Sequence, residues 1–272
     1  MTDVTTDPLD ALVGRDLAGR AALVTGASRG IGHAIAAELL TRGASVTITA
    51  RKPDELAAAA DALVAEAAGG DADRVLAVPG NAGSAEARAD AVTRTVERFG
   101  NLAILVNNTG INPTYGPLVD ADLDAVRKTF DTNVVAALGF VQQAYRAWMG
   151  EHGGAIVNLA SVAGLRSTGV IAAYGASKAA LIRLTEELAA QLGPAIRVNA
   201  VAPAIVRTRF ATALYADDEE AVAAAYPMKR LGAPEDVARL VGFLVSDAAA
   251  WITGETVRVD GGILATGTLG SA

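Results

Sequence analysis

Cysteine is absent from this chain of 272 residues, which excludes disulfide bonds and thiolate metal ligands. A reducing compartment, the cytoplasm, fits that absence. The two histidines, His33 and His152, cannot form a metal site without cysteine nearby, so no metal is expected. The chain also lacks an apolar run long enough to cross a bilayer, because Asp61 and Glu66 interrupt its alanine-rich stretch. The acidic stretch 1–16 has neither the basic start nor the apolar segment of a signal peptide.

Acidic residues outnumber basic ones, 30 against 23, and the formal net charge is −7. This balance disfavours nucleic acid or an anionic membrane as the main partner. Hydrophobic residues make up 51% of the chain, enough for one sizeable core in a single α/β domain. No linker rich in proline, glycine or serine divides the chain. We therefore expect one domain at 17–272 behind a flexible tail, 1–16.

Short, branched, apolar runs alternate with amphipathic stretches of helical spacing. Strands are expected at Ala21–Thr25, Ser45–Ala50, Arg74–Val78, Leu102–Val106, Ala155–Ala160, Ile196–Val201 and Thr256–Val259. Helices are expected at about 30–42, 54–68, 84–99, 120–149, 172–192 and 234–246. This alternation predicts a parallel sheet with helices on both faces. The irregular segment 204–230, between a strand end and the next helix, is a natural lid over a site.

The first predicted strand runs directly into a glycine-rich turn, Thr25-Gly-Ala-Ser-Arg-Gly-Ile-Gly32, and then into a helix. Glycine lets the backbone turn sharply and approach a ligand closely, while the helix start offers free N–H groups to a pyrophosphate. The glycine spacing differs from the G-x-G-x-x-G dinucleotide motif. By itself the turn is also compatible with a tight strand–helix connection that binds nothing.

The end of the second predicted strand bears on which dinucleotide fits. An acidic residue there would hold the ribose 2′-hydroxyl of NAD(H), whereas a basic one would hold the 2′-phosphate of NADP(H). Here the strand is followed by Arg51 and Lys52, with no acid before Asp54, and Arg29 adds a second guanidinium from the glycine-rich turn. Each arginine alone is more typical of a solvated surface, but two near one place suit a phosphate. The pair favours NADP(H) over NAD(H).

A proton-transfer set follows later in the chain, where Ser161 precedes Tyr174-Gly-Ala-Ser-Lys178. Tyr174 and Lys178 are four residues apart in a predicted helix and therefore lie on one face. A free tyrosine has a pKa of about 10, and a nearby ammonium should lower it. Ser161 follows the fifth predicted strand, at an edge where ligands bind, and could hold a carbonyl oxygen while Tyr174 supplies the proton. A bare Y-x-x-x-K pair is usually an ordinary surface feature; the serine and the glycine-rich turn favour catalysis.

Together these motifs resemble those of the short-chain dehydrogenases/reductases over nearly all of residues 17–262. The matching motifs are the glycine-rich turn, Asn107-Asn108-Thr109-Gly110, Asn133, Ser161, Tyr174-x-x-x-Lys178, the Pro203 stretch, and Ile252-Thr-Gly-Glu255 leading to Asp260-Gly-Gly262. The resemblance implies a single Rossmann-type catalytic domain that binds a dinucleotide, with a doubly wound parallel seven-stranded sheet and a small helical substrate lid. It also implies an oxidoreductase acting on CH–OH groups with NAD(P), and a homotetramer with its C-terminal motif at a subunit contact.

The resemblance further assigns roles to individual residues. Tyr174 would be the general acid/base, Lys178 would bind the nicotinamide ribose and lower the tyrosine pKa, and Ser161 would orient the substrate carbonyl. Asn133 would hold a water in a proton relay through Lys178. The residues expected to bind the cofactor are Gly26, Ser28, Arg29, Gly30, Ile31, Gly32, Arg51, Asn81, Asn108, Gly110, Tyr174, Lys178, Val206 and Thr208. Among them, Asn81 and Asn108 would line the adenosine side, and Val206 and Thr208 would meet the nicotinamide amide.

Two positions depart from the family pattern. Thr109 stands where alanine is commoner, which adds a hydroxyl and a methyl group near the cofactor. Ala204 follows Pro203 where glycine is usual, and a positive φ angle there would strain an alanine. Neither change removes a catalytic group.

Within the family the chain resembles both 3-oxoacyl-[acyl-carrier-protein] reductases and peroxisomal-type NADPH carbonyl reductases, which share Asn112-Pro113. Carrier-protein reductases usually show a basic patch for their acidic partner, whereas the matching stretches here, Gly150–Gly154 and Gln191–Ala195, are nearly neutral. The leading hypothesis is NADP(H)-dependent reduction of a small ketone or a 3-oxoacyl thioester. A general carbonyl or secondary-alcohol dehydrogenase, a non-catalytic dinucleotide sensor and a structural subunit are the alternatives.

Overall fold

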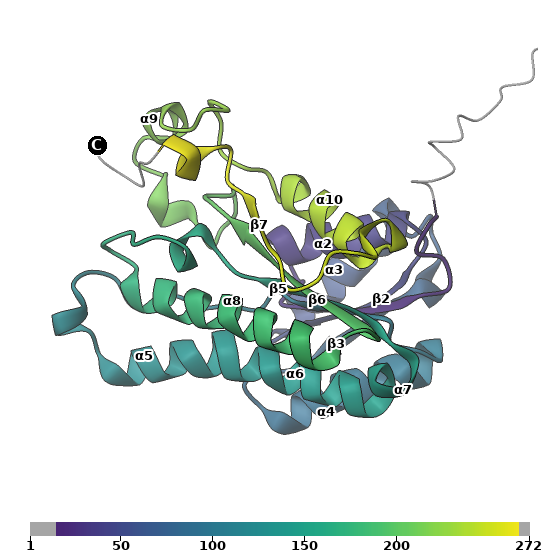
Figure 1. Ribbon diagram of the computed structural model, residues 1–272. Helices are drawn as coiled ribbons and strands as arrows, with labels where there is room; N and C mark the ends of the chain where they lie inside the picture. Colours follow the sequence, from purple (N-terminus) through teal and green to yellow (C-terminus); the bar gives the residue numbers. More distant parts are fainter. Residues whose placement is uncertain (1–14, 267–272) are drawn as a thin grey trace, which may run out of the picture.

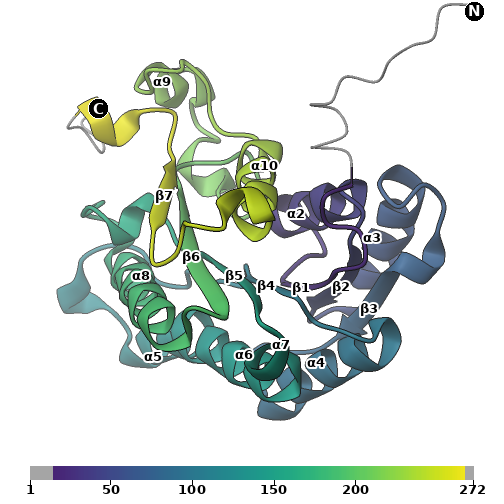
Figure 2. The same cartoon turned by 45° about the vertical axis from the view of Figure 1, so that its right-hand side comes forward.

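A parallel sheet of seven strands runs through the centre of the computed structural model, which describes residues 15–266. The strand order is β3-β2-β1-β4-β5-β6-β7, read from right to left in Figure 2. The strands are β1 (Ala21–Thr25), β2 (Ser45–Ala50), β3 (Val75–Pro79), β4 (Ile104–Asn107), β5 (Gly154–Leu159), β6 (Ile196–Pro203) and β7 (Thr256–Val259). All seven predicted strands are present, and the doubly wound fold class is confirmed.

Helices cover both faces of the sheet (Figure 1). One layer contains α2 (Gly30–Thr41), α3 (Pro53–Glu66) and α10 (Pro234–Val245), and the other contains α4 (Ala85–Phe99), α6 (Ala136–Ala144) and α8 (Ala172–Leu192). Successive residues of a strand point to opposite faces, so each strand supplies both cores. Val24 packs in the core under α2, whereas Leu23 packs in the core under α4 and α6. This is why the central strands are continuously apolar.

The sheet reverses its winding between β1 and β4. The chain moves outward from β1 to β2 and β3, and then returns to place β4 on the other side of β1. The segments that leave the carboxyl ends of β1 and β4 therefore separate, one to each face. In open α/β sheets a ligand crevice forms at such a switch point, and the glycine-rich turn lies here.

The long helix expected at about 120–149 is not regular. The structure has α5 (Leu123–Phe130), α6 and α7 (Gly150–His152), joined by π-helical turns at Asp131–Val135 and Tyr145–Met149. A π turn holds one extra residue, which hydrophobic periodicity does not reveal, and such turns are frequent at functional sites. The first of them carries Asn133.

The predicted lid segment, 204–230, contains a 3₁₀ turn at Thr212–Leu214 and the short helix α9 (Glu219–Ala224). Its base is fixed to the body of the domain. Val206 pairs with Gly232 in a β-bridge, and Tyr226 packs in a small core with Leu231 and Ile263. In Figure 1, α9 stands above β7, beside the C-terminal end of the described chain.

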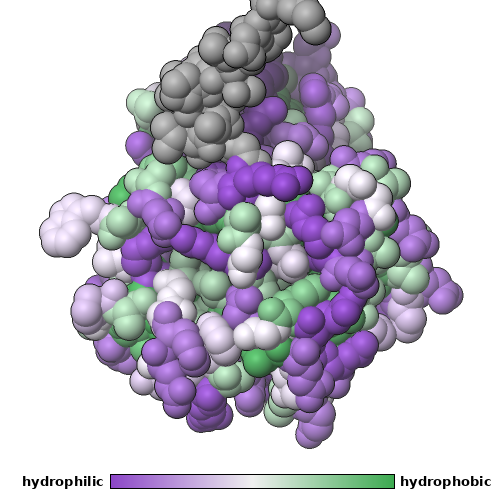
Figure 3. All heavy atoms as spheres, turned by 90° about the vertical axis from the view of Figure 1, so that its right-hand side faces the viewer, coloured by the Kyte–Doolittle hydropathy of each residue, from purple (hydrophilic) through white to green (hydrophobic). Residues whose placement is uncertain are grey.

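No helix in the described range 15–266 is long and apolar enough to cross a membrane. On the face shown in Figure 3, hydrophilic residues predominate, and apolar ones lie in small patches among them.

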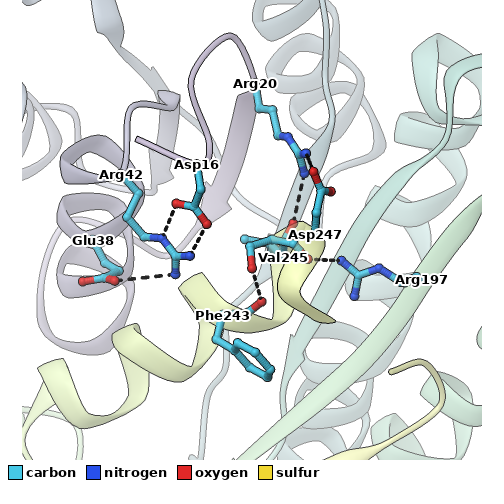
Figure 4. Close-up of polar contacts among 9 residues, drawn as sticks. Asp16, Arg20, Glu38, Arg42, Arg197, Phe243, Val245 and Asp247 are labelled. Carbon is cyan, nitrogen blue, oxygen red and sulfur yellow. Dashed lines mark hydrogen bonds and ion pairs between the residues drawn. The ribbon is translucent and has the colours of Figure 1, made fainter. Parts of the chain in front are cut away.

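Three arginines fasten the ends of helices to the sheet (Figure 4). Arg42 binds Asp16 through two hydrogen bonds and also pairs with Glu38, so the last residue of the predicted tail is held against α2. Arg20 pairs with Asp247 at 2.6 Å, just beyond the end of α10. Arg197 on β6 donates to the carbonyl oxygens of Leu244, Ser246 and Ile252, at 2.7, 3.0 and 3.3 Å.

We expect Arg197→Met to lower the free energy of unfolding by about 2–3 kcal/mol, because helix-end carbonyls would lose a charged donor. The urea midpoint, at unchanged m-value, measures this loss. Arg183→Met is the matched control, since Arg183 is exposed on α8 and, among residues 15–266, forms ion pairs only with Glu186 and Glu187. The effect of this substitution should be within about 0.5 kcal/mol. Equal midpoints for the two variants would contradict the role of Arg197.

Candidate active site

The glycine-rich turn has no room for side chains at its glycines. Gly26 and Gly30 have φ angles of 65° and 58°, in the left-handed region that favours glycine. A Cβ atom on Gly26 would lie 3.0 Å from the Thr109 hydroxyl, and one on Gly32 would lie 2.7 Å from the Gly26 carbonyl oxygen. The turn ends at Arg29, which caps α2 without a side-chain hydrogen bond. The first N–H groups of α2 are therefore free of a side-chain cap, as a pyrophosphate site requires.

Asn108 ties this turn to the end of β4. Its side-chain Nδ2 donates to the carbonyl oxygens of Thr25 and Gly26, at 2.8 and 3.0 Å. The Thr25 hydroxyl in turn accepts from the backbone N–H groups of Asn108 and Thr109, both at 3.0 Å. The two strands that flank the switch point are thus joined by side-chain bonds where the crevice begins.

Asn133 is the central hydrogen-bonding residue on the other side of the crevice. Its side chain is 1% exposed. Oδ1 accepts from the Ile111 N–H at 2.8 Å, and Nδ2 donates to the Ile111 carbonyl oxygen and to the Ser177 hydroxyl, both at 3.0 Å. Ser177 then donates to the Tyr174 carbonyl oxygen at 2.7 Å. The loop after β4 is therefore fastened to the helix that carries Tyr174. Ser177 was not among the predicted site residues.

Tyr174, Ser161 and Lys178 come together as the sequence predicts. Tyr174 is 9% exposed and its hydroxyl is hydrogen-bonded with Ser161. The Ser161 hydroxyl also accepts from the Ala163 N–H at 3.2 Å, which fixes its position at the end of β5. Lys178 is 3% exposed, and its Nζ donates to the Leu159 carbonyl oxygen at 2.6 Å. An ideal Cβ on Gly110 would lie 3.3 Å from Lys178 Nζ and 3.6 Å from Asn133 Oδ1, so both groups face one point.

Burial sets the protonation of this pair. Burial raises the pKa of Tyr174 to about 12, against the opposing hydrogen bond from Ser161. Burial also lowers the pKa of Lys178 to about 8. The expected lowering of the tyrosine pKa by the lysine is therefore wrong for this structure. The Lys178 ammonium lies 5.5 Å from the centroid of the tyrosine ring and is bonded to Leu159, so desolvation dominates at the phenol.

The cationic residues predicted beside the adenosine ribose lie at the surface. Arg29 is not free, because its Nη1 is 2.9 Å from Glu55 Oε2, and Lys52 Nζ is 2.6 Å from Glu55 Oε1. Arg51 is exposed at the end of β2, and within residues 15–266 its side chain has no hydrogen-bond or ion-pair partner. Glu55, in the first turn of α3 directly after Asp54, was not among the predicted site residues.

The start of the predicted lid segment lies against the glycine-rich turn. Ala204 does not have a positive φ, so the strain considered for it does not arise. Val206 is buried, and a Cβ on Gly30 would lie 3.2 Å from Thr208 Cγ2, so this segment rests on the glycine-rich turn. Phe210 then reaches Tyr174, with ring centroids 6.1 Å apart, yet Phe210 remains 58% exposed. Phe210 was not among the predicted site residues, because no sequence motif includes it.

The remaining predicted residues surround the same crevice. Ser28 and Ile31 belong to the glycine-rich turn and the start of α2, and Ile31 packs on the core beneath. Asn81 is exposed just after β3, where its Oδ1 accepts from the Gly83 N–H at 3.1 Å. No group of three or more histidine, aspartate or glutamate side chains in the described part of the chain could hold a metal ion.

The low pKa of Lys178 can be tested directly, because the sequence has only four lysines. With ¹³C-labelled lysine, we expect one Cε signal to titrate with a midpoint near 8, since burial disfavours the ammonium, which then loses its proton as the pH rises. NMR spectra of Lys178→Met should lack that signal. If the signal lost in the variant titrates near 10.4, as a solvated lysine does, the buried-lysine account is wrong.

Known proteins share both this fold and this sequence. The family model described as Enoyl-(Acyl carrier protein) reductase matches residues 26–264. Dehydrogenase/reductase SDR family member 4 of Mus musculus is 36% identical over 249 residues, covering 90% of this chain and 88% of that protein. Tropinone reductase-like 3 of Erythroxylum coca is 34% identical over 253 residues, covering 92% of this chain and 95% of that protein.

Solved structures agree with the sequence relatives. A short-chain dehydrogenase/reductase from Brucella melitensis, described as glucose/ribitol dehydrogenase, has a TM-score of 0.85 at 33% identity. A putative short-chain alcohol dehydrogenase from Sinorhizobium meliloti has the same TM-score at 38% identity. Each alignment covers 92% of this chain and 98% of the other. The chain belongs to the short-chain dehydrogenase/reductase family, and it is an NAD(P)-dependent oxidoreductase that acts on carbonyl and hydroxyl groups.

Proposed function

We propose that this enzyme reduces a ketone or a 3-oxoacyl thioester to the alcohol with NADP(H), and that Tyr174 is its general acid/base. The observation that carries the proposal is the buried Tyr174 hydroxyl, hydrogen-bonded with Ser161 at the carboxyl end of β5. A phenol whose pKa is about 12 is protonated at neutral pH, and so it is ready to donate. This is the form that reduction of a carbonyl requires.

The residues around the crevice fit a dinucleotide. The first N–H groups of α2 carry no side-chain cap and can bind a pyrophosphate, and Gly110 lies beside Lys178 Nζ, which can bind a ribose hydroxyl. The bound cofactor would supply the hydride. Gly26, Gly30 and Gly32 would hold its phosphates, Lys178 the nicotinamide ribose, and Val206 and Thr208 the nicotinamide amide.

Ser161 and Tyr174 would act on the carbonyl oxygen. Ser161 has a hydroxyl held by the Ala163 N–H, and that hydroxyl can donate to the oxygen and orient it. Tyr174 would donate its phenolic proton to the same oxygen as negative charge develops there. The ammonium of Lys178, on the same face of α8, would stabilise the phenolate left behind. Oxidation of an alcohol would use the same groups in reverse.

Asn133 has a narrower part in the relay than its family role suggests. Both Nδ2 protons are already donated, so its side chain has only a remaining Oδ1 lone pair to offer a water. Oδ1 faces the same point beside Gly110 as Lys178 Nζ, which is where a relay to Lys178 would pass. The bonds to Ile111 and Ser177 give Asn133 a positioning role as well.

The preference for NADP(H) rests on the basic residues at the carboxyl end of β2. Arg29 and Lys52 both pair with the Glu55 carboxylate, and each contacts a different oxygen of it. Arg51 lies next to Lys52 in the chain. A 2′-phosphate offers three acceptor oxygens to such a group, whereas a 2′-hydroxyl offers only one.

The substrate side favours an apolar group next to the carbonyl. Phe210 is a large, exposed aromatic side chain beside Tyr174, where it can cover an acyl or alkyl chain. A 3-oxoacyl chain and a simple ketone both satisfy this, so a general carbonyl or secondary-alcohol dehydrogenase is the second candidate. A CoA or carrier-protein thioester and a free ketone present the same reacting group.

We also propose a homotetramer. Trp251 is 99% exposed just before the C-terminal motif, and Val135 and Tyr145 are exposed on the helical stretch of α5 and α6. Large apolar side chains are therefore exposed on two separate faces. Two such faces support two different contacts between copies of the chain, which a tetramer of dihedral symmetry needs.

We expect Tyr174→Phe to lower turnover about a hundredfold or more, the usual scale for general acid catalysis. Turnover is followed as NADPH oxidation with acetoacetyl-CoA, a 3-oxoacyl-carrier-protein thioester, a 1,2-dicarbonyl and retinal. Tyr145→Phe, which removes an exposed hydroxyl elsewhere, should be unaffected. Near-normal turnover of Tyr174→Phe would contradict the assignment of Tyr174 as the general acid. If the wild-type protein binds NADPH but turns over none of these substrates, the alternative of a non-catalytic dinucleotide sensor is favoured.

We expect Phe210→Ala to raise KM for an apolar ketone about tenfold, or about 1.4 kcal/mol, because the substrate loses an apolar contact. The change in kcat should be small, since Phe210 makes no bond to the reacting atoms. Phe243→Ala removes an exposed phenylalanine from α10 and is the control. Kinetics in which kcat falls while KM is unchanged would contradict a substrate-covering role.

A further inference from the structure

Glu55 lies among the cations that are proposed to hold the 2′-phosphate. Its carboxylate comes from the first turn of α3, beside α2 (Figure 1). Oε2 is 2.9 Å from Arg29 Nη1 and Oε1 is 2.6 Å from Lys52 Nζ. Each carboxylate oxygen is thus bound by a cation from a different segment, one from the glycine-rich turn and one from the end of β2.

A third cation, Arg209, follows Thr208 at the start of the predicted lid segment, and its charge acts on Glu55. Thr208 rests on Gly30 of the glycine-rich turn, which brings the next residue close to Arg29. The hydrogen bond from Lys52 is the main cause that holds the pKa of the Glu55 carboxyl below its usual value; burial opposes it, and the charges of Lys52, Arg29 and Arg209 each lower the pKa by less. Glu55 is therefore an anion at neutral pH, paired with two cations and influenced by the charge of a third.

The fold does not depend on these ion pairs. The Lys52–Glu55 pair is exposed and spans three residues at a helix start, a kind of pair that contributes little to stability. Pro53 and Asp54 already suit the first turn of α3. The bond to Arg29, by contrast, crosses 26 residues of sequence to reach the cofactor crevice.

A carboxylate in this position affects the two cofactors in opposite ways. It can accept a hydrogen bond from the ribose 2′-hydroxyl of NAD(H), but it repels a 2′-phosphate and competes with it for the same guanidinium. We propose that Glu55 is an internal competitor for the cations of the 2′-phosphate site, and that it sets how strongly the enzyme discriminates NADP(H) from NAD(H). This inference rests on the proposed location of the adenosine ribose beside Arg29 and Arg51.

The test is the binding of NADP⁺ and NAD⁺ to the whole protein, measured by calorimetry without substrate. In Glu55→Gln, which keeps the shape and removes the charge, the Kd for NADP⁺ should fall about tenfold and the Kd for NAD⁺ should stay the same or rise. Glu186→Gln is the matched control, because Glu186 is also exposed and also pairs with a cation three residues away, Arg183. It makes the same change in net charge and should leave both values unchanged.

A second variant tests the same site from the lid. Arg209→Gln should weaken NADP⁺ binding severalfold and leave NAD⁺ binding unchanged, because only NADP⁺ carries the 2′-phosphate that is proposed to lie near Arg209. The readout in both variants is the ratio of the two Kd values. A ratio that stays within twofold of the wild type in Glu55→Gln overturns the inference, even if the wild type prefers NADP⁺. If the wild type binds both cofactors equally, the proposed preference for NADP(H) is wrong. If the ratio of the two Kd values then shifts toward NADP⁺ in Glu55→Gln, the role of Glu55 as competitor is still supported.

Discussion

Desolvation of Tyr174 and Lys178 is the constraint on which the site depends. Both side chains lie on one face of α8, packed against the ends of β5 and β6, and burial favours the neutral form of each. The phenol therefore keeps its proton, and the lysine, with a pKa of about 8, is an ammonium at neutral pH that loses its charge at a pH well below that of a solvated lysine. A simple pair of opposite charges, with a phenolate beside an ammonium, would need water or another partner to persist at this depth.

The strands of the sheet were predictable because the apolar pattern of a buried strand is visible within a few consecutive residues. Strands that are buried on both faces are mainly apolar. β1 (Ala21–Thr25), which is buried along its whole length, shows this pattern most fully, and the edge strand β7 (Thr256–Val259), which contains Arg258, shows it least. The π turn at Asn133 was not predictable in the same way. It is held by Ile111 and Ser177, which are 22 and 44 residues distant, and no pattern within the helix records such partners. Tertiary hydrogen bonds override the regular helical period there.

The motif residues Ser161, Tyr174 and Lys178 came together as their spacing predicted. The direction of the pKa shift of Tyr174 was not predicted, because the pKa is raised and not lowered. Sequence shows that a lysine is one helical turn away; it does not show that the ammonium is bonded to Leu159 or how little water reaches the phenol. Glu55 and Phe210 were missed for a related reason. Each is part of the site only because the fold places it beside a distant residue: Glu55 beside Arg29, and Phe210 beside Tyr174.

The lid start connects these features, because three consecutive residues reach three different parts of the site. Thr208 rests on Gly30 of the glycine-rich turn, the charge of Arg209 acts on Glu55, and Phe210 lies beside Tyr174. At the proposed 2′-phosphate site, a cofactor that draws Arg209 toward its phosphate would act on the backbone that also positions Phe210. Cofactor choice and substrate fit would then be coupled through a short stretch of chain, which is held at its base by the pairing of Val206 with Gly232.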